Sequence, residues 1–301
     1  QNEHSYRSWC QHVYMMCTGA TGAADWALEN MAWCVREFNL DYIKIDDNEW
    51  AVCHDPTHGH DADDGEWYQI QGVYHILRGL RERFPNLVIE NCAGGSQRAD
   101  VGMARYCVPI QVHDRCSPSV LERRYAHAFG CIYPQFAPLL AVHDAPSSVE
   151  QLRWRVMARM MGQINCDFLD RLNAEQRAEM QRLVATYKRL RPTLHGDRYV
   201  LAEPVIVLEP DVPEATNWEA YEYLSPDGGL VSLFCFRCES PDERFVARLR
   251  GLEAGASYRV WAHTGGEGGI YTGTQLADEG LVCTLPARRN AEVFILERLA
   301  G

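Results

Sequence analysis

The amino-acid sequence predicts an α/β fold of parallel strand–helix units followed by an antiparallel β-domain. In residues 1–196, apolar residues spaced three or four apart alternate with short β-branched runs, which is the order of helices and strands in a parallel sheet. After about residue 197, short apolar runs are separated by Gly, Asp and Pro turns, which is typical of antiparallel sheets. We therefore expect one domain over 1–196 and a second over 197–301.

The elements of the first domain follow from apolar periodicity and from the residues that end helices. Leu28, Met31, Val35 and Phe38 have helical spacing, and Asn173 with Gln three residues later is an N-cap signal. The predicted elements are a helix over 22–40, a strand over 41–46, a helix over 67–84, a strand over 87–91, apolar stretches at 106–112 and 131–133, and helices over 118–129, 148–161 and 173–191. Such an order indicates either a barrel or an open doubly wound sheet.

In the second domain, strands are predicted from apolar runs between turns. The runs are 230–236, 245–249, 258–261 and 292–296. Asp227-Gly228-Gly229 is a hairpin-type turn signal between two such runs. Alternation along a strand places Cys235 and Cys238 on opposite faces, so we interpret them as buried small residues and not as a zinc knuckle.

Composition excludes several classes of function. The net charge of -12 and the isoelectric point near 5.4 disfavour nucleic acid and anionic membranes as partners, so we expect an uncharged substrate. The 12 cysteines are scattered and not densely paired, which indicates a reducing cytoplasm. Neither a signal peptide nor an apolar run of about 18 residues is apparent.

Polar residues follow the predicted strands, where the loops of parallel α/β folds converge on one mouth. Alternation places Lys44, Asp46 and Asn48 on one side of the first strand, so Asp46 has a neighbouring cation that favours its ionised, nucleophilic form. The alternative interpretation is a solvated acidic turn. After the third strand, Asp114 adds a carboxylate at the same rim; alternatively, His113 and Asp114 cap the next helix together with Ser117.

The second strand ends in Glu90-Asn91-Cys92-Ala93-Gly94-Gly95-Ser96-Gln97-Arg98. Its small residues would let a ligand approach the backbone closely, with Asn91 and Arg98 as hydrogen-bond donors. A Gly-Gly turn is, however, also ordinary loop geometry.

These three strand ends resemble glycoside hydrolase family 36, the α-galactosidase or melibiase family. The family's Lys-Trp-Asp-Met-Asn motif is similar to residues 44–48, and its Glu-Asn-Cys-Ser-Ser-Gly-Gly-Gly-Arg-Phe-Asp segment is similar to residues 90–100. Further similar segments, in the family's order, are Tyr133-Pro134, His143, Tyr187-Lys188, Arg191-Pro192 and Tyr271 to Leu281.

The resemblance implies a (β/α)8 barrel of the TIM type, of which this chain would hold about the last half, followed by a small β-sandwich. It implies a retaining α-galactosidase with Asp46 as nucleophile and a second carboxylate, for which we take Asp114, as acid/base. Lys44, Cys92 and Gly95 would line the sugar site, and Asn48, Asn91 and Arg98 complete the predicted substrate-binding set. No cofactor or metal is implied.

The acid/base segment departs from the family's Ser-Asp-x-x-Asp-x-x-x-Arg. His113 precedes Asp114, Ser117 stands where the family has the second Asp, and alignment on Arg123 would instead place Cys116 at the acid/base position. The sequence starts at Gln1 and not Met, so we expect a fragment that needs the rest of a barrel or a partner, and a homo-oligomer for the full-length protein.

Other functions remain open from the sequence. The loop from Cys53 and His54 through His58, His60, Asp61, Asp63 and Asp64 is rich in metal-ligand types, which suggests a metal-dependent hydrolase, although such polar loops are usually surface. The modified acid/base segment is also compatible with a non-catalytic carbohydrate-binding relative. Within the family, α-N-acetylgalactosaminidases and transglycosylases are further alternatives.

Overall fold

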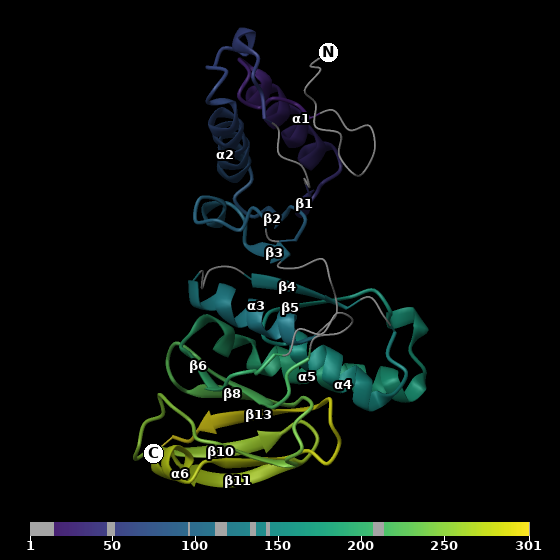
Figure 1. Cartoon of the computed structure of the whole chain (residues 1–301), viewed down its shortest axis with the longest axis vertical. Helices are drawn as coiled ribbons and strands as arrows, with labels where there is room; N and C mark the ends of the chain where they lie inside the picture. Colours follow the sequence, from purple (N-terminus) through teal and green to yellow (C-terminus); the bar gives the residue numbers. More distant parts are fainter. Residues whose placement is uncertain are drawn as a thin grey trace. The chain divides into compact units, whose positions relative to one another are not determined.

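The computed structural model describes residues 15–46, 52–95, 97–111, 119–132, 137–142, 145–206 and 214–300 (Figure 1). The chain divides into two compact units, Gln1–Val112 and His113–Gly301. This division lies elsewhere than the domain boundary at 196/197, which stays a prediction. Among the helices in the described ranges, none has the length and apolar character to cross a membrane.

The first unit alternates helices with parallel strands. Its elements are α1 (Ala23–Glu37), β1 (Tyr42–Asp46), α2 (Gly65–Arg83), β2 (Val88–Cys92) and β3 (Pro109–Gln111). Strand β1 pairs in parallel with β2, and β2 with β3. The core lies between the two helices and the sheet, where Leu28 and Val35 pack with Leu77 and Ile89. The predicted spacing of the first helix is thus confirmed at its centre, whereas Phe38 follows the helix end and is exposed.

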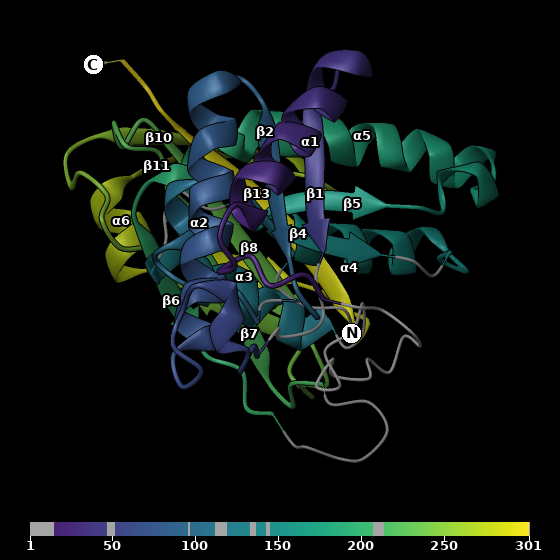
Figure 2. The ribbon, with the colours of Figure 1, turned by 90° about the horizontal axis from the view of Figure 1, so that it is seen from above.

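The second unit begins with further parallel strands and helices, α3 (Ser119–Ile132), β4 (Ala137–Val142), α4 (Val149–Arg159), β5 (Gln163–Cys166) and α5 (Ala174–Leu190). Strands β4 and β5 are parallel, and α4 packs on β4, β5 and α5 (Figure 2). The capping box of Asn173 and Gln176 opens α5 as predicted, and a 3-10 helix containing Pro192 follows it. The prediction of a strand-like stretch at 131–133 is wrong at its start, because α3 continues through Ile132.

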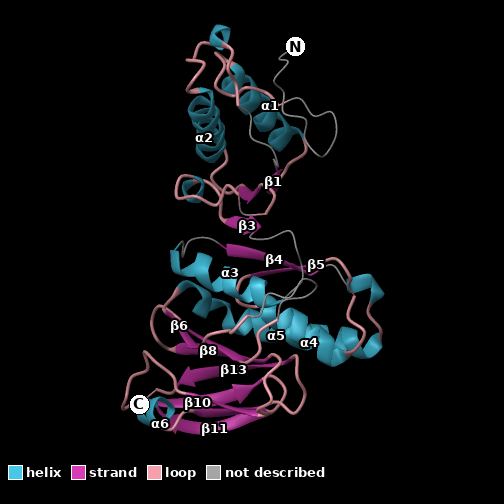
Figure 3. Ribbon diagram, in the orientation of Figure 1, coloured by secondary structure: helices cyan, strands magenta, loops and turns pink. Residues whose placement is uncertain are grey.

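The C-terminal strands are antiparallel and form two sheets (Figure 3). They are β6 (Arg198–Ala202), β7 (Trp218–Leu224), β8 (Leu230–Arg237), β9 (Arg244–Ala247), β10 (Ser257–Ala262), β11 (Gly266–Thr272), β12 (Leu281–Thr284) and β13 (Asn290–Arg298), with the short helix α6 (Gly273–Asp278) before β12. One sheet has the order β11-β10-β13-β8-β7-β6, and the other pairs β12 with β9. Gly228, with φ 64°, turns the chain between β7 and β8 as the sequence predicts.

The larger sheet is covered on both faces, and alternation along β7 and β8 sorts its side chains. Ala220, Leu233 and Cys235 belong to the core shared with the smaller sheet, which makes this part a β-sandwich. On the opposite face, Phe236 meets Trp154 of α4 edge to face, with ring centroids 5.8 Å apart. Cys238 lies on that second face, since Arg123 of α3 contacts it, so the predicted separation of the two cysteines is confirmed. The architecture is therefore partial-barrel strand–helix units followed by a β-sandwich.

Candidate functional site

Strands β1 and β2 have one face toward the helices and one polar face. Ile43, Ile45 and Ile89 pack into the core with α1 and α2. Because side chains alternate along a strand, Lys44 and Asp46 point away from the helices. The parallel register places Glu90 beside Lys44 and Cys92 beside Asp46 on this polar face. The carboxyl ends of both strands thus present a compact group of ionisable and thiol side chains.

Lys44 is the centre of this group. Its Nζ lies 3.5 Å from Asp46 Oδ2 and 3.4 Å from Glu90 Oε1, and it donates a hydrogen bond of 3.0 Å to Gln111 Oε1 on β3. The side chains of Lys44 and Asp46 are 38% and 41% exposed, whereas that of Glu90 is 6% exposed. A ligand can therefore reach the Lys44 ammonium and the Asp46 carboxylate, while the buried Glu90 carboxylate fixes the position of the ammonium.

The charges of the group follow from its mutual contacts. Partial burial alone would lower the pKa of Lys44, but the acidic groups of Cys92, Glu90 and Asp46 raise it, so Lys44 is a cation. Burial, together with the neighbouring Asp46, raises the pKa of Cys92 to about 11, although Lys44 opposes this. Tyr42 donates to Glu90, and burial and this bond raise the pKa of Tyr42. The face therefore holds neutral donors, one cation and two carboxyl groups, which suits a ligand rich in hydroxyls.

The loop after β2 makes a tight turn beside this face. Gly94 and Gly95 have φ values of 50° and 81°, in the left-handed region that glycine adopts at low cost. The Ala93 amide donates to the Gly95 carbonyl, and the Gln97 amide donates to the Ala93 carbonyl. A Cβ added at Gly94 would lie 2.8 Å from Gln97 Nε2. The turn thus has a structural requirement for glycine, and a role of Gly95 in ligand approach stays a prediction.

The structure brings together only part of the predicted site. Lys44, Asp46 and Cys92 share the polar face, whereas Asn91 is buried on the opposite side and donates 2.9 Å to the Arg98 carbonyl. Asn91 Oδ1 accepts no hydrogen bond from the residues that the structure describes. Asn48 and Asp114 lie outside the described residues, as do His113, Cys116, Ser117, Tyr133-Pro134 and His143. The roles of all these residues in sugar binding or catalysis stay predictions.

Sequence reasoning missed three contributors to this face, Tyr42, Glu90 and Gln111. A signal was present for Glu90, because alternation along β2 places it on the same side as Cys92, and parallel pairing then brings it next to Lys44. The position of Gln111 on this face cannot be predicted from periodicity, because β3 is only three residues long.

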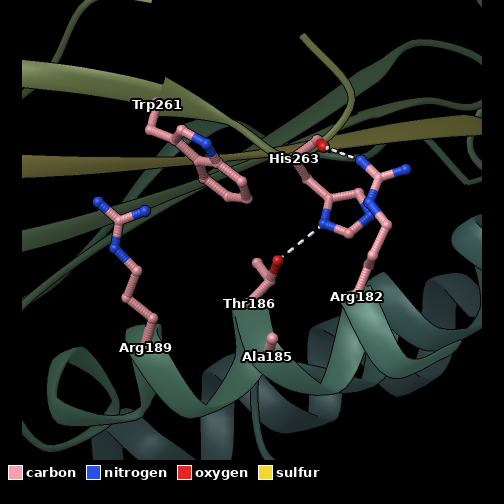
Figure 4. Close-up of a pocket in the computed structure, with 6 residues that line it drawn as sticks. All are labelled: Arg182, Ala185, Thr186, Arg189, Trp261 and His263. Carbon is pink, nitrogen blue, oxygen red and sulfur yellow. Dashed lines mark hydrogen bonds between the residues drawn. The ribbon is translucent and has the colours of Figure 1, made fainter. Parts of the chain in front are cut away.

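The second unit contains a pocket whose lining residues contact one another (Figure 4). It is lined by α5, by β10 and by His263, which follows β10. His263 is fully buried, 2.8 Å from Glu179 through Nε2 and 2.8 Å from Thr186 through Nδ1. Burial alone would raise the pKa of Glu179, but Arg153 and His263 lower it. At the other side of the pocket, Arg189 stacks 5.1 Å from the Trp261 ring centre. These contacts join α5 to the sandwich and account for the polar lining.

Arg123, the residue that offers an alternative alignment of the acid/base segment, is part of the core. It is fully buried, and its Nε donates 2.9 Å to Glu219 Oε2. Its Nη2 lies 2.9 Å from Glu214, and the guanidinium stacks within 4.7 Å of the Trp154 and Phe236 ring centres. The structure thus gives Arg123 a fold-stabilising role, and the Glu214, Glu219 and Cys238 cluster has a guanidinium where a metal ion would bind.

Comparisons with known proteins agree with the two parts of the fold. Residues 2–196 match the family model of melibiase, and residues 218–296 match that of the glycosyl hydrolase family 36 C-terminal domain. Alpha-galactosidase C of Emericella nidulans is 29% identical over 283 residues, which cover 91% of this chain and 35% of that protein.

Solved structures show the same fold. The galactosidase domain of an alpha-galactosidase-sucrose kinase superposes with a TM-score of 0.78 at 20% identity, covering 99% of this chain and 40% of that chain. A variant of the alpha-galactosidase AgaA of Geobacillus stearothermophilus in complex with raffinose gives a TM-score of 0.76 at 20% identity, covering 99% and 41%. The chain therefore spans well under half the length of these proteins.

Proposed function

We propose that this chain, which belongs to the melibiase family, carries the nucleophile of an α-galactosidase that cleaves terminal α-galactosides with retention. The main support is the group of Lys44, Asp46 and Cys92 at the carboxyl ends of β1 and β2. An accessible carboxylate beside a cation is the form that a nucleophile requires. Relatives with α-galactosidase names support the reaction class.

In the proposed first step, Asp46 attacks the anomeric carbon and forms a glycosyl ester, while the bond to the leaving oxygen breaks. A second carboxyl group gives its proton to that oxygen. It then takes a proton from water, whose oxygen displaces Asp46 and releases the sugar. We assign the second carboxyl group to Asp114. In retaining enzymes the two carboxyl groups are about 5 to 5.5 Å apart, because no water has to fit between nucleophile and sugar in the first step.

The residues around Asp46 have complementary roles in this proposal. Lys44 donates to sugar hydroxyls and holds Asp46 in place through their 3.5 Å contact. Cys92, as a neutral thiol, forms an uncharged wall next to Asp46. Asn48, Gly95 and Arg98 are proposed to contact the substrate as well, whereas the predicted contact of Asn91 is not proposed again, because its side chain is buried on the opposite side of the sheet and bonds to the Arg98 carbonyl.

The proposed substrate is an uncharged oligosaccharide with a terminal α-galactosyl unit. Raffinose is bound in the solved complex of a structural relative, and the net charge of -12 of this chain agrees with an uncharged ligand. An α-N-acetylgalactosaminide is the alternative substrate, and a sugar-binding protein without turnover is the alternative function.

The test is hydrolysis of an aryl α-galactoside by the intact protein and by variants, with azide as external nucleophile. Asp46→Ala should abolish hydrolysis, and azide should restore turnover with a β-galactosyl azide as product, because azide replaces the missing nucleophile. Asp114→Ala should lower hydrolysis about 10²- to 10⁴-fold, and azide should then give an α-galactosyl azide, since Asp46 has already inverted the anomeric carbon once.

Asp41→Ala is the matched control. Asp41 is an exposed acid immediately before β1, at the end opposite Asp46, so this variant should keep wild-type turnover. Absence of turnover by folded wild-type protein with both aryl α-galactosides and aryl α-N-acetylgalactosaminides would overturn the enzyme proposal. An α-galactosyl azide from Asp46→Ala would overturn the assignment of the nucleophile.

A further inference from the structure

The loop between β1 and α2 meets the segment before α1, and four side chains of metal-ligand type converge there. They are Cys17 from the segment and Cys53, His58 and His60 from the loop, and one ligand atom from each lies within 4.8 Å of all the others. Cys53 and His60 are only 3% and 6% exposed. The interpretation of this loop as polar surface is therefore wrong for these two residues, and Cys17 was not among its candidate ligands.

From this convergence we infer that Cys17, Cys53, His58 and His60 bind a structural zinc ion with tetrahedral coordination. Two thiolates with two imidazoles are a standard ligand set of closed structural zinc sites. Zinc–sulfur and zinc–nitrogen bonds of about 2.3 and 2.0 Å place tetrahedral ligand atoms roughly 3.3 to 3.8 Å apart. Cys17 Sγ lies 3.3 Å from His60 Nε2, and Cys53 Sγ lies 3.1 Å from His58 Nδ1. These two distances are near the tetrahedral spacing, and each remaining pair of ligand atoms lies within 4.8 Å.

The outer contacts of both imidazoles are those that orient metal-binding histidines. His60 Nδ1 is 2.9 Å from the Asp61 carbonyl, which can only accept, so the proton is on Nδ1 and Nε2 has its lone pair toward the cluster. His58 Nε2 lies 3.6 Å from the Asp55 carboxylate, on the side of the ring away from Cys53. A carbonyl or carboxylate behind the ring orients a ligating imidazole. His60 therefore has its tautomer set for metal binding, and His58 has a carboxylate behind its ring and Nδ1 toward Cys53.

The loop is shaped by its own contacts. Asp55 caps the 3-10 helix Pro56–His58 by accepting from the Thr57 amide at 2.9 Å. Gly59, with φ 86°, then turns the chain so that both imidazoles face the cluster, and a Cβ there would lie 2.4 Å from Thr21 Oγ1. Such preorganisation reduces the ordering cost of binding.

The segment before α1 is fixed against the loop and against α2 by its own contacts. The Thr18 amide donates 2.7 Å to Gln69 Oε1, the Thr18 hydroxyl donates 2.8 Å to the Gln69 carbonyl, and the Thr21 amide donates 2.9 Å to the His58 carbonyl. These bonds hold Cys17 at the cluster.

Zinc binding replaces the two thiol protons, which pass to solvent, and leaves a site without net charge from two thiolates and one divalent cation. The ion would connect residues 43 positions apart in sequence, Cys17 and His60. Because α1 leads into β1 and β1 leads into α2, the starts of both helices lie at the carboxyl end of β1, where Asp46 is. The zinc ion therefore stabilises the loop that follows the proposed nucleophile and takes no part in the reaction.

The first test measures the metal content of the intact protein, purified without chelator and dialysed into metal-free buffer. Wild type should contain about one zinc per chain, and Cys17→Ser and His60→Gln should lose it. Cys34→Ser is the matched control, since Cys34 is a partly buried thiol on α1 outside the cluster, and it should keep the zinc. Zinc-free folded wild type, or zinc retained by both cluster variants, would overturn the proposal.

The second test needs only wild-type protein and so does not depend on the folding of variants. Replacement of the metal with Co2+ should give the visible bands of tetrahedral cobalt together with thiolate-to-cobalt charge transfer in the near ultraviolet. Bound cobalt without the charge-transfer band, or a Cys17–Cys53 disulfide found by peptide mapping of the protein as purified, would overturn the proposal. Neither result depends on the galactosidase assay, so the two proposals succeed or fail separately.

Discussion

Replacement of Arg123 tests whether this residue stabilises the fold or acts in the acid/base segment. Its guanidinium is fully buried between two aromatic rings and pairs with Glu219, which is itself fully buried. Arg123→Met keeps much of the side-chain volume but leaves the Glu219 carboxylate without its cation. Loss of one partner of a buried pair costs about 3 to 5 kcal/mol. The stacking on Trp154 and Phe236 adds about 2 kcal/mol at a desolvated site, part of which Met retains. We expect a loss of about 5 kcal/mol.

Urea unfolding of the intact protein, followed by far-ultraviolet circular dichroism, measures this loss. Arg124→Met is the control, because Arg124 is the exposed neighbour on the same helix and should change the free energy of unfolding by less than about 0.5 kcal/mol. Arg123→Met combined with Glu219→Gln should be more stable than Arg123→Met alone, since no unpaired charge is then buried. A loss below about 1 kcal/mol for Arg123→Met, together with a large fall in kcat, would refute the structural role and favour a functional one.

Two further predictions concern buried and exposed charges. Glu222 lies in the sandwich core with its pKa raised to about 8, mainly by burial, against the lowering effect of the Arg250 amide, so folding favours its protonated form. The stability gained from this protonated form is fully present below the unfolded pKa of 4.5 and is lost as pH rises toward 8. Between these pH values the urea midpoint should therefore fall less in Glu222→Gln than in wild type. Equal falls of the midpoint with pH in both proteins would contradict the raised pKa. Lys44→Met should lower kcat/KM at least tenfold, about 1.4 kcal/mol, while the urea midpoint stays near that of wild type; the reverse pattern would show that Lys44 is structural.

The sequence predicts most of the fold because its signals are local. The spacing of apolar residues in the helix at 23–37, the capping box at Asn173 and the turn at Gly228 each depend on a few neighbouring residues, and all three agree with the structure. The strand-like stretch at 131–133 is wrong because Cys131 and Ile132 complete the last turn of α3, and an apolar run this short does not distinguish a helix end from a strand.

The sites are less predictable because they depend on contacts between distant segments. Alternation gives the polar face of β1 from the sequence alone, but the partner of Lys44 on β3 requires the fold. The proposed zinc ligands show the same limit more clearly. Three of them are in one loop, whereas the fourth, Cys17, lies 36 positions before Cys53, the first of the three. The spacing of residues within one loop therefore reveals only part of the ligand set, and such a partial set is interpreted as a polar surface loop.

Lys44 in the first unit and Arg123 in the second each contact two carboxylates, but their physical roles differ. An exposed ion pair contributes about 0 to 1 kcal/mol to stability, and Lys44 is 38% exposed, so its pairing with Asp46 and Glu90 explains little of the fold. A buried pair cannot lose a partner without a large cost, and Arg123 is such a case. A cation that contributes little to stability, yet is held by three oxygen ligands on an open polar face, is best explained by a ligand that binds there. This contrast favours the β1–β2 face, and not the buried cluster around Arg123, as the place where the substrate binds.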